Sequence, residues 1–383
     1  MSDGTQKAYI VFTASASFFM GYYVRLVWGI ISSFSSLHPT TADDGLVFSL
    51  FFLTYIIVQF PAGVLSDRLG SRNIISMALV GLAVSSFISG AASSMTAEYL
   101  GSLLMGFSAG WIYPATIRLL SSQFHADGLA RAIGYYTLAW PISIIMLGAT
   151  LPWTVEYLGW RWGYYTVAVA CALLAALTLK MSDSRSSSSS GGLFSVSLLK
   201  DRNVLMLSLG GFCFFLSYWT LTLFLYKFLL TEGMSAAHAG LIYSLTAVLG
   251  LVTTIASGRI ISRLSVSFTL AVTVIAYGVL IALIPSTVDI YLLAAIALTM
   301  GGIRFVVTPA QSTAAAVIGG AHAGSVSGAA NVFWQLSGLA AGALAPYIIQ
   351  ATGFSSLWYA MGGICALSSV FYISMRIGAG PKT

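Results

Sequence analysis

Long apolar runs separated by short polar segments recur along the whole chain. Twelve of them reach about 20 residues or more, the length at which one helix crosses the hydrocarbon core of a bilayer. The predicted spans are residues 8–34, 45–65, 73–92, 98–122, 128–152, 160–181, 203–230, 236–260, 266–285, 289–316, 323–349 and 354–377. Runs this continuous are typical of helices, which satisfy their own backbone hydrogen bonds in lipid.

One polar segment differs from the other connections. Residues 183–202 are rich in Ser and Gly, a composition typical of a flexible linker. The sequence therefore predicts an N-terminal six-helix half at 1–182, a linker at 183–202 and a C-terminal six-helix half at 203–383.

Composition supports an integral membrane protein. Charged residues make up 7% of the chain, against about 25% in soluble domains. The net charge of +6 does not indicate a nucleic-acid partner, because the cations gather in alternate loops.

The three cysteines lie singly in predicted spans, so we expect no disulfide framework, no metal site and no cofactor. The polar start before the first span lacks the short apolar region and cleavage site of a signal peptide, so we expect it to be retained.

The distribution of charge predicts the orientation. Cations gather on one side of the predicted spans, namely Lys7, Arg68, Arg72, Arg131, Lys180, Arg185, Lys200, Arg202, Arg259, Arg263, Arg376 and Lys382. The opposite loops carry mostly acids, namely Asp43, Asp44, Glu98, Glu156, Glu232 and Asp289. The positive-inside rule then places both termini and the linker in the cytoplasm, as in a multi-pass protein of the plasma or inner membrane.

The two halves share an internal repeat. Gly63 and Arg68 in GVLSDRLG correspond to Gly258 and Arg263 in GRIISRLS at an offset of 195 residues. The prolines of GWIYPAT and FVVTPAQ have the same offset. This repeat predicts two parallel six-helix bundles.

With these features the chain resembles the major facilitator superfamily over essentially its whole length. The string after the second span, GVLSDRLGSR, matches the loop motif of that family except at Ser71. The resemblance implies an all-α membrane fold of twelve transmembrane helices. It also implies a gate that holds cytoplasmic helix ends together, formed by Gly63, Asp67, Arg68, Gly70 and Arg72.

Two departures disfavour the drug exporters of the family. Ser102 stands where those exporters often carry an arginine in the fourth span, and Trp140-Pro141 replaces the Gly-Pro of their fifth-span motif. The first-span string GYYVRLVWG instead resembles the organic-anion-transporting branches, although Val24 stands where an aspartate often precedes the arginine.

Arg25 and Arg304 are the main candidates for substrate binding. Each lies near the middle of a predicted span, one in each half, and neither has a counterpart at the 195-residue offset. A guanidinium cannot lose its proton, so a buried one needs an anionic or strongly polar partner. The resemblance implies that the first and tenth helices line a central cavity. We expect the two arginines to form a two-sided clamp for an anion.

Aromatic and amide side chains complete the candidate site. Tyr22 and Trp28 lie three residues on either side of Arg25 and share its helical face. The other candidates at cavity depth are Tyr113, Tyr136, Trp140, Tyr218, Gln311, Asn331, Trp334 and Gln335. Packing, or anchoring at the lipid interface, is the alternative role for each aromatic residue, and interhelical hydrogen bonding is the alternative for the amides.

Glycines spaced four apart, at 106 and 110 and at 324 and 328, predict close helix approaches.

The acidic residues limit the mechanism. All eleven carboxylates fall in loops or at the ends of predicted spans, so no obvious residue titrates within the membrane. Proton-linked symport with a weak acid, uniport, anion exchange and sodium coupling therefore stay open. We expect a monomer in a lipid bilayer, with a small anion as substrate and protons or sodium as the coupling ion.

Three functions compete at this point. The favoured one is secondary active transport of a small organic anion, a carboxylate or a sugar acid, by alternating access. An exporter of hydrophobic or cationic drugs is the alternative, disfavoured by two buried cations. A non-transporting receptor ranks last, and an enzyme is not expected because no base, metal cluster or activated nucleophile is apparent.

Overall fold

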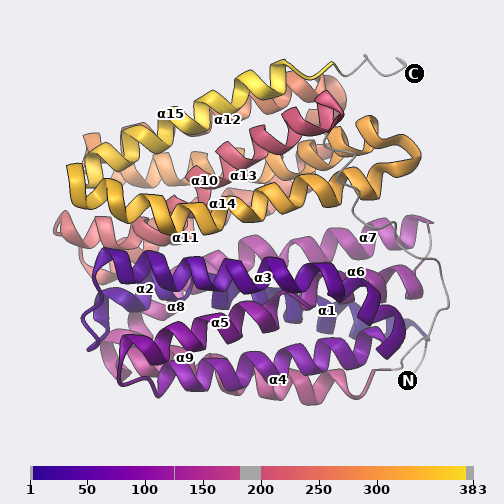
Figure 1. Cartoon of the computed structure of the whole chain (residues 1–383), viewed down its shortest axis with the longest axis horizontal. Helices are drawn as coiled ribbons and strands as arrows, with labels where there is room; N and C mark the ends of the chain where they lie inside the picture. Colours follow the sequence, from indigo (N-terminus) through magenta and orange to yellow (C-terminus); the bar gives the residue numbers. More distant parts are fainter. Residues whose placement is uncertain (1–2, 125, 182–199, 377–383) are drawn as a thin grey trace. The chain divides into compact units, whose positions relative to one another are not determined.

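All regular secondary structure of the described residues is helical. The computed structural model describes residues 3–124, 126–181 and 200–376 (Figure 1). The chain divides into two compact units, Met1–Ser190 and Gly191–Thr383. Most of the predicted linker lies outside the described residues.

The first unit contains nine α-helices and one 3-10 helix within its described residues. They are α1 (Asp3–Leu26), α2 (Trp28–Ile31), η1 (Ser32–Phe34), α3 (Thr41–Leu69), α4 (Ser71–Gly90), α5 (Met95–Ala109), α6 (Ile112–Gln123), α7 (Ala126–Thr137), α8 (Ala139–Leu158) and α9 (Trp160–Thr178). Three predicted spans are thus each divided between consecutive helices. Pro114 and Pro141 lie in the first turns of α6 and α8, where a missing N–H costs least.

The second unit has longer, less interrupted helices. They are α10 (Arg202–Thr231), α11 (Ala236–Arg263), α12 (Val266–Leu283), η3 (Ile284–Ser286), α13 (Ile290–Gly319), η4 (Gly320–His322), α14 (Ala323–Thr352) and α15 (Phe354–Ile373). The starts of α10 to α13 are capped by side chains that accept backbone N–H groups, as Ser235 does for α11 and Asp289 for α13. These bounds lie within a few residues of the predicted spans.

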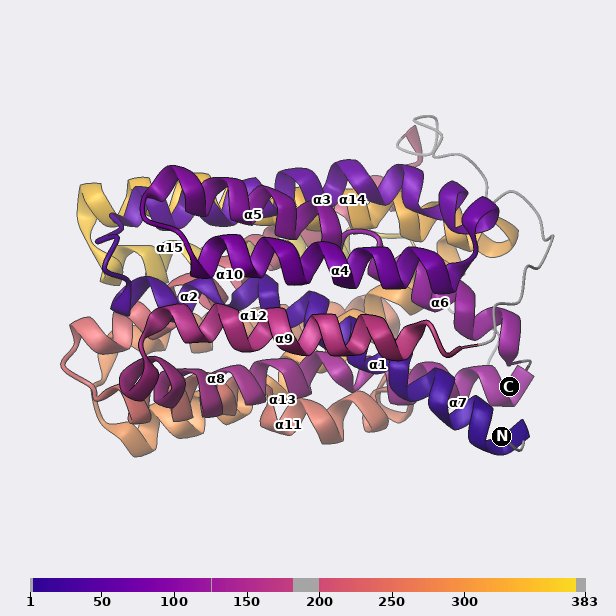
Figure 2. The same ribbon diagram turned by 90° about the horizontal axis from the view of Figure 1, so that it is seen from below.

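Eleven helical segments among the described residues are long and apolar enough to cross a membrane. They correspond to eleven of the twelve predicted spans. The remaining one, α9, is a helix of 19 residues that begins Trp-Arg-Trp-Gly-Tyr-Tyr, and this polar and aromatic start lowers its mean hydropathy. Figure 2 shows α4 and α9 side by side, where they pack against each other.

The internal repeat is visible in the packing of each unit. In the first unit α1 packs on α8, α3 on α5 and α4 on α9. In the second unit the corresponding helices form the same pairs: α10 with α14, α11 with α13 and α12 with α15. The prediction of two six-helix bundles built on one plan is confirmed.

Two equivalent glycines explain one of these pairs. A Cβ atom on Gly106 of α5 would lie 2.1 Å from the carbonyl oxygen of Phe51 in α3. A Cβ on Gly301 of α13 would lie 2.9 Å from the carbonyl oxygen of Thr246 in α11. Both the glycines and the residues they face are 195 positions apart, so the same close approach is built into each half. The predicted approach at Gly324 and Gly328 is wrong for the part of the chain that the structure describes, where nothing lies within 4 Å of either Cβ position.

Candidate functional site: two buried arginines among aromatic rings

Arg25 is buried in the first unit, with 6% of its surface exposed. Its guanidinium carbon lies 4.3 Å from the ring centre of Tyr55 and 5.2 Å from that of Tyr22. Phe51 and Phe52 complete the set of rings at 5.6 and 5.2 Å. Three of the four rings come from α3, so α3 supplies most of the surface on which the cation rests. A guanidinium over aromatic faces is stabilised electrostatically without a carboxylate.

Arg304 is fully buried in the second unit, at 0% exposure. Its guanidinium carbon lies 4.2 Å from the ring centre of Tyr218, and Nη1 donates a hydrogen bond of 2.8 Å to Thr308. Three further rings, those of Phe214, Phe215 and Phe305, lie at 5.3, 5.0 and 5.6 Å. The arginine comes from α13 and most of the rings come from α10. We call each arginine with its four rings an aromatic cage.

The two cages share a sequence signal that the offset of 195 does not reveal. The first helix of each half carries the pattern Phe-Phe-x-x-Tyr, ending at Tyr22 in α1 and at Tyr218 in α10, 196 residues apart. The tyrosine of each pattern contacts the arginine of its own unit. The arginines have no repeat counterparts, but the tyrosine of this pattern, which contacts each guanidinium, does.

A second repeated feature is a glycine that faces an aromatic residue of the cage, and the two residue types change helices between the halves. In the first unit Gly110 faces the Tyr55 backbone, its Cβ position being 2.8 Å from that carbonyl oxygen. In the second unit Gly250 faces the Phe305 ring, with a Cβ position 2.2 Å from it. Tyr55 and Gly250 are equivalent at 195 residues, and so are Gly110 and Phe305. Each half thus pairs one cage aromatic with one glycine, on opposite helices of the pair.

Four predicted site residues of the first unit are brought together around Phe18. The Phe18 ring stacks on Tyr136 at 4.7 Å and lies 5.8 Å from Tyr113 and 6.4 Å from Tyr22. Trp140 extends the group, with its ring centre 5.1 Å from that of Tyr22. Through Tyr22 this cluster is continuous with the Arg25 cage. Tyr113 is the most open member, at 44% exposed.

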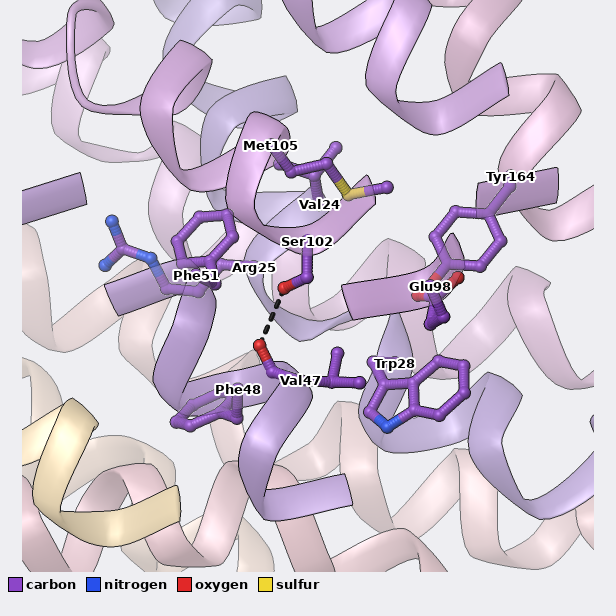
Figure 3. Close-up of a pocket in the computed structure, with 10 residues that line it drawn as sticks. All are labelled: Val24, Arg25, Trp28, Val47, Phe48, Phe51, Glu98, Ser102, Met105 and Tyr164. Atoms are coloured by element: carbon purple, nitrogen blue, oxygen red, sulfur yellow. Dashed lines mark hydrogen bonds between the residues drawn. The ribbon is translucent and has the colours of Figure 1, made fainter. Parts of the chain in front are cut away.

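Trp28 contacts residues other than those of this cluster. The chain leaves the helix at Val27, and the Trp28 indole Nε1 donates to Asp44 Oδ1 at 3.0 Å. Figure 3 shows Trp28 near Glu98 and Tyr164, while the Arg25 side chain extends away from them. All four residues line one small cavity, together with Ser102, whose hydroxyl donates to the Val47 carbonyl at 2.6 Å.

The expectation that Asp44 and Glu98 lie in loops is wrong. Asp44 is in the first turn of α3 and 1% exposed, and Glu98 is the fourth residue of α5 and 0% exposed. Helix α5 starts at Met95 because Ser94 caps it, accepting the Ala97 N–H at 3.3 Å. The predicted span began at Glu98 and placed this acid at its edge. Glu98 therefore lies within a candidate membrane span, Met95–Gln123.

The remaining candidates of the second unit occupy two places. Trp334 is 8% exposed and its ring centre lies 5.7 Å from that of Phe215, so it borders the Arg304 cage. On the same helix the amides of Gln335 and Asn331 bond to each other at 3.3 Å. Gln311 is fully buried and its Nε2 donates to the Tyr372 hydroxyl at 2.7 Å, which directs it towards α15.

Only part of the predicted gate lies among the residues whose side chains are described. The motif is helical up to Leu69, and the turn falls at Gly70, whose φ of 83° favours glycine. Arg72 Nη1 donates to the Met181 carbonyl at 3.2 Å, joining the start of α4 to the residues after α9. The side chains of Asp67 and Arg68, and the surroundings of Gly63, lie outside the described residues.

The fold and the site together define a multi-pass membrane transporter, built as two repeated helical bundles with a buried arginine in each. The chain belongs to the Major Facilitator Superfamily, whose profile matches residues 11–342. The family and the relatives below are transporters rather than enzymes, as predicted.

Curated relatives include carriers of sugar acids. A D-galactonate transporter of Escherichia coli O6:H1 is 31% identical over 32% of this chain and 29% of its own length. A probable galactarate/D-glucarate transporter of Bacillus subtilis is 26% identical over 54% of this chain and 53% of its own length. The matches with these two relatives thus span between about a third and a half of the length of each.

Solved structures share the fold at low sequence identity. The nucleoside transporter NupG has a TM-score of 0.80 at 15% identity, covering 98% of this chain and 99% of its own. A bacterial homolog of the human lysosomal transporter Spinster, crystallised inward-facing and unoccupied, has a TM-score of 0.71 at 16% identity, covering 96% and 95%.

Proposed function

We propose that this protein is a secondary active transporter of a small organic anion, a carboxylate or sugar acid, working by alternating access. The observation that carries the proposal is the burial of one guanidinium in each half against a set of aromatic rings. Ring faces hold such a cation in place, and a guanidinium can bind a carboxylate in fork geometry. The relatives named as D-galactonate and galactarate/D-glucarate transporters support a sugar acid as the cargo class.

Arg25 and Arg304 each bind the anion in this proposal. Aromatic rings stabilise a guanidinium through the ring faces and do not neutralise its charge, so each arginine keeps a positive potential for cargo. Tyr22, Tyr113, Tyr136 and Trp140 line the path to Arg25, and Tyr218 and Trp334 do so for Arg304. A cationic drug would be repelled by both guanidiniums, which disfavours the exporter alternative.

The other parts of the proposal concern the setting of the site. Both termini lie in the cytoplasm of a plasma or inner membrane protein that acts as a monomer, and residues 183–202 link its halves. Gly63, Asp67, Arg68, Gly70 and Arg72 hold the cytoplasmic gate. Transport is proton-linked symport or anion exchange.

Uptake by cells that express single variants tests the role of the arginines. We expect Arg25→Gln and Arg304→Gln each to reduce uptake of radiolabelled D-galactonate at least about tenfold, because charge-assisted hydrogen bonds contribute about 1.5–3 kcal/mol. Arg131→Gln, at an exposed position of α7, is the matched control and should transport normally. Unchanged uptake by both arginine variants, at equal amounts in the membrane, would rule the proposal out.

A further inference from the structure

Glu98 is a buried carboxyl group that the proposed anion site does not use. It is 0% exposed, and its Oε1 accepts a hydrogen bond of 2.5 Å from the Tyr164 hydroxyl of α9. Its Oε2 is buried and accepts no hydrogen bond within the described residues. Ser89 of α4 lies beside the carboxyl, and its hydroxyl is buried as well.

The charged groups around Glu98 are engaged elsewhere. Arg161 of α9 donates to the carbonyls of Gly90 and Ala92 at 3.0 and 2.7 Å. On α3, Asp44 accepts the Trp28 indole N–H and Asp43 accepts the Tyr99 hydroxyl at 2.5 Å.

Arg25 of α1 lines the same cavity as Glu98, yet its side chain extends towards its own aromatic cage (Figure 3). Among the described residues, no cation forms an ion pair with Glu98.

We propose that Glu98 is a proton-binding site whose occupancy is linked to anion binding at Arg25. An ionised carboxylate that is fully buried without a cation is costly, so this carboxyl holds a proton where it is buried as in this structure. Its place in the first turn of α5 favours the negative form, because helix N-termini stabilise anions. The group is therefore neutral when buried and able to ionise when water reaches it.

The link to Arg25 is electrostatic and rests on the proposed function. While Arg25 has no anion, its positive charge across the cavity favours the ionised form of Glu98. An anion on Arg25 cancels that positive charge, which favours uptake of a proton by Glu98. Coupling of this kind is reciprocal, so a proton on Glu98 strengthens anion binding. Anion and proton then bind together, which makes proton-linked symport the mode that this site supports.

Reconstituted transporter with D-galactonate as the probe separates proton coupling from binding. Glu98→Gln keeps the size of the side chain and an acceptor for Tyr164 but cannot exchange a proton. We expect the accumulation driven by a pH gradient to fall at least about tenfold in this variant, since coupling factors are typically 5–150-fold. Exchange of internal for external D-galactonate, which needs no net proton movement, should stay within about threefold of wild type. Glu156→Gln, a matched change at an exposed position of the same unit, should behave as wild type in both assays.

Infrared spectroscopy gives a readout that does not depend on transport. A protonated carboxyl has a C=O stretch that a carboxylate lacks, and we expect this band in wild type and in Glu156→Gln but not in Glu98→Gln. If Glu98→Gln does not fold, Glu98→Asp should shift the band instead. A band that neither substitution removes or shifts, or gradient-driven accumulation by Glu98→Gln equal to wild type, would overturn the proton site. If wild type itself moves no D-galactonate, the proposed cargo fails, and the band alone then decides whether Glu98 holds a proton.

Discussion

At the scale of single residues, the guanidiniums are held by ring faces. Tyr55 makes the shortest ring contact with Arg25 and Tyr218 the shortest with Arg304, at 4.3 and 4.2 Å. A planar guanidinium stacks on a ring better than a compact ammonium does, so the cages explain why arginine rather than lysine occupies both positions.

Tyr55 tests whether the ring itself matters. Tyr55→Phe keeps the aromatic face and should bind D-galactonate nearly as wild type does. Tyr55→Leu removes a cation–π contact of about 0.5–2 kcal/mol, so we expect the Kd to rise about 2- to 30-fold. Isothermal titration of the purified variants measures both values. Equal weakening by the two substitutions would assign the effect to the hydroxyl and not to the ring.

Some of this site could be read from the sequence and some could not. Arg25 and Arg304 stand out because a charge within an apolar run is rare. The cage rings of α3 do not stand out, namely Phe51, Phe52 and Tyr55. Aromatic residues in an apolar helix look the same in the sequence whether they face lipid, the core or a cation. The prediction that Glu98 lies in a loop is wrong because Ser94 caps α5, and the helix therefore begins before the apolar pattern does. Its burial also depends on Tyr164, a residue 66 positions away.

At the scale of helices, close packing sets the position of the cage rings. Gly106 lets α5 reach the α3 backbone at Phe51, and Gly110 does the same at Tyr55. The hydroxyls of Ser102 and Thr54 then join the two helices through the carbonyls of Val47 and Leu103 at 2.6 and 2.7 Å. The four-residue glycine spacing predicted this approach, and the structure confirms it.

Gly106→Ala should therefore destabilise the first unit. Its Cβ would meet a backbone carbonyl that cannot move without shifting α3, and overpacking of this kind costs about 1–3 kcal/mol. We expect a lower thermal unfolding midpoint in detergent and weaker D-galactonate binding. Gly134→Ala in α7 is the control, because no described residue lies within 4 Å of its Cβ position. A Gly106→Ala protein as stable as Gly134→Ala would show that this approach is not tight.

At the scale of the whole molecule, the repeat explains how one plan carries two unlike cages. The same helix pairs form in both units, and equivalent positions supply the glycines and the Phe-Phe-x-x-Tyr pattern. Span positions and the repeat could be predicted because apolar runs and glycines are periodic in the sequence. The helix breaks at Val27 and Leu138 could not, since the break at Val27 has no proline nearer than Pro39, and the Pro141 that follows Leu138 is also compatible with a continuous helix.

Labelling of single cysteines tests the predicted orientation. In a background without the native cysteines, Val288→Cys should react in intact cells with a maleimide that cannot cross membranes, because the charge distribution predicts that this residue lies on the acidic, outer side. Lys200→Cys, also exposed, should react only after the membrane is opened. The reverse pattern would place the termini outside.

The most direct test of the central claim is equilibrium binding of an acid and its uncharged counterpart to the purified protein. D-galactonate carries a carboxylate that D-galactose lacks, so only the acid should raise the unfolding temperature of wild type, as ligands that bind the native state do. This stabilisation should disappear in Arg25→Gln and in Arg304→Gln. Equal stabilisation by the acid and the neutral sugar, or full stabilisation of both arginine variants by the acid, would contradict anion recognition by the two buried guanidiniums.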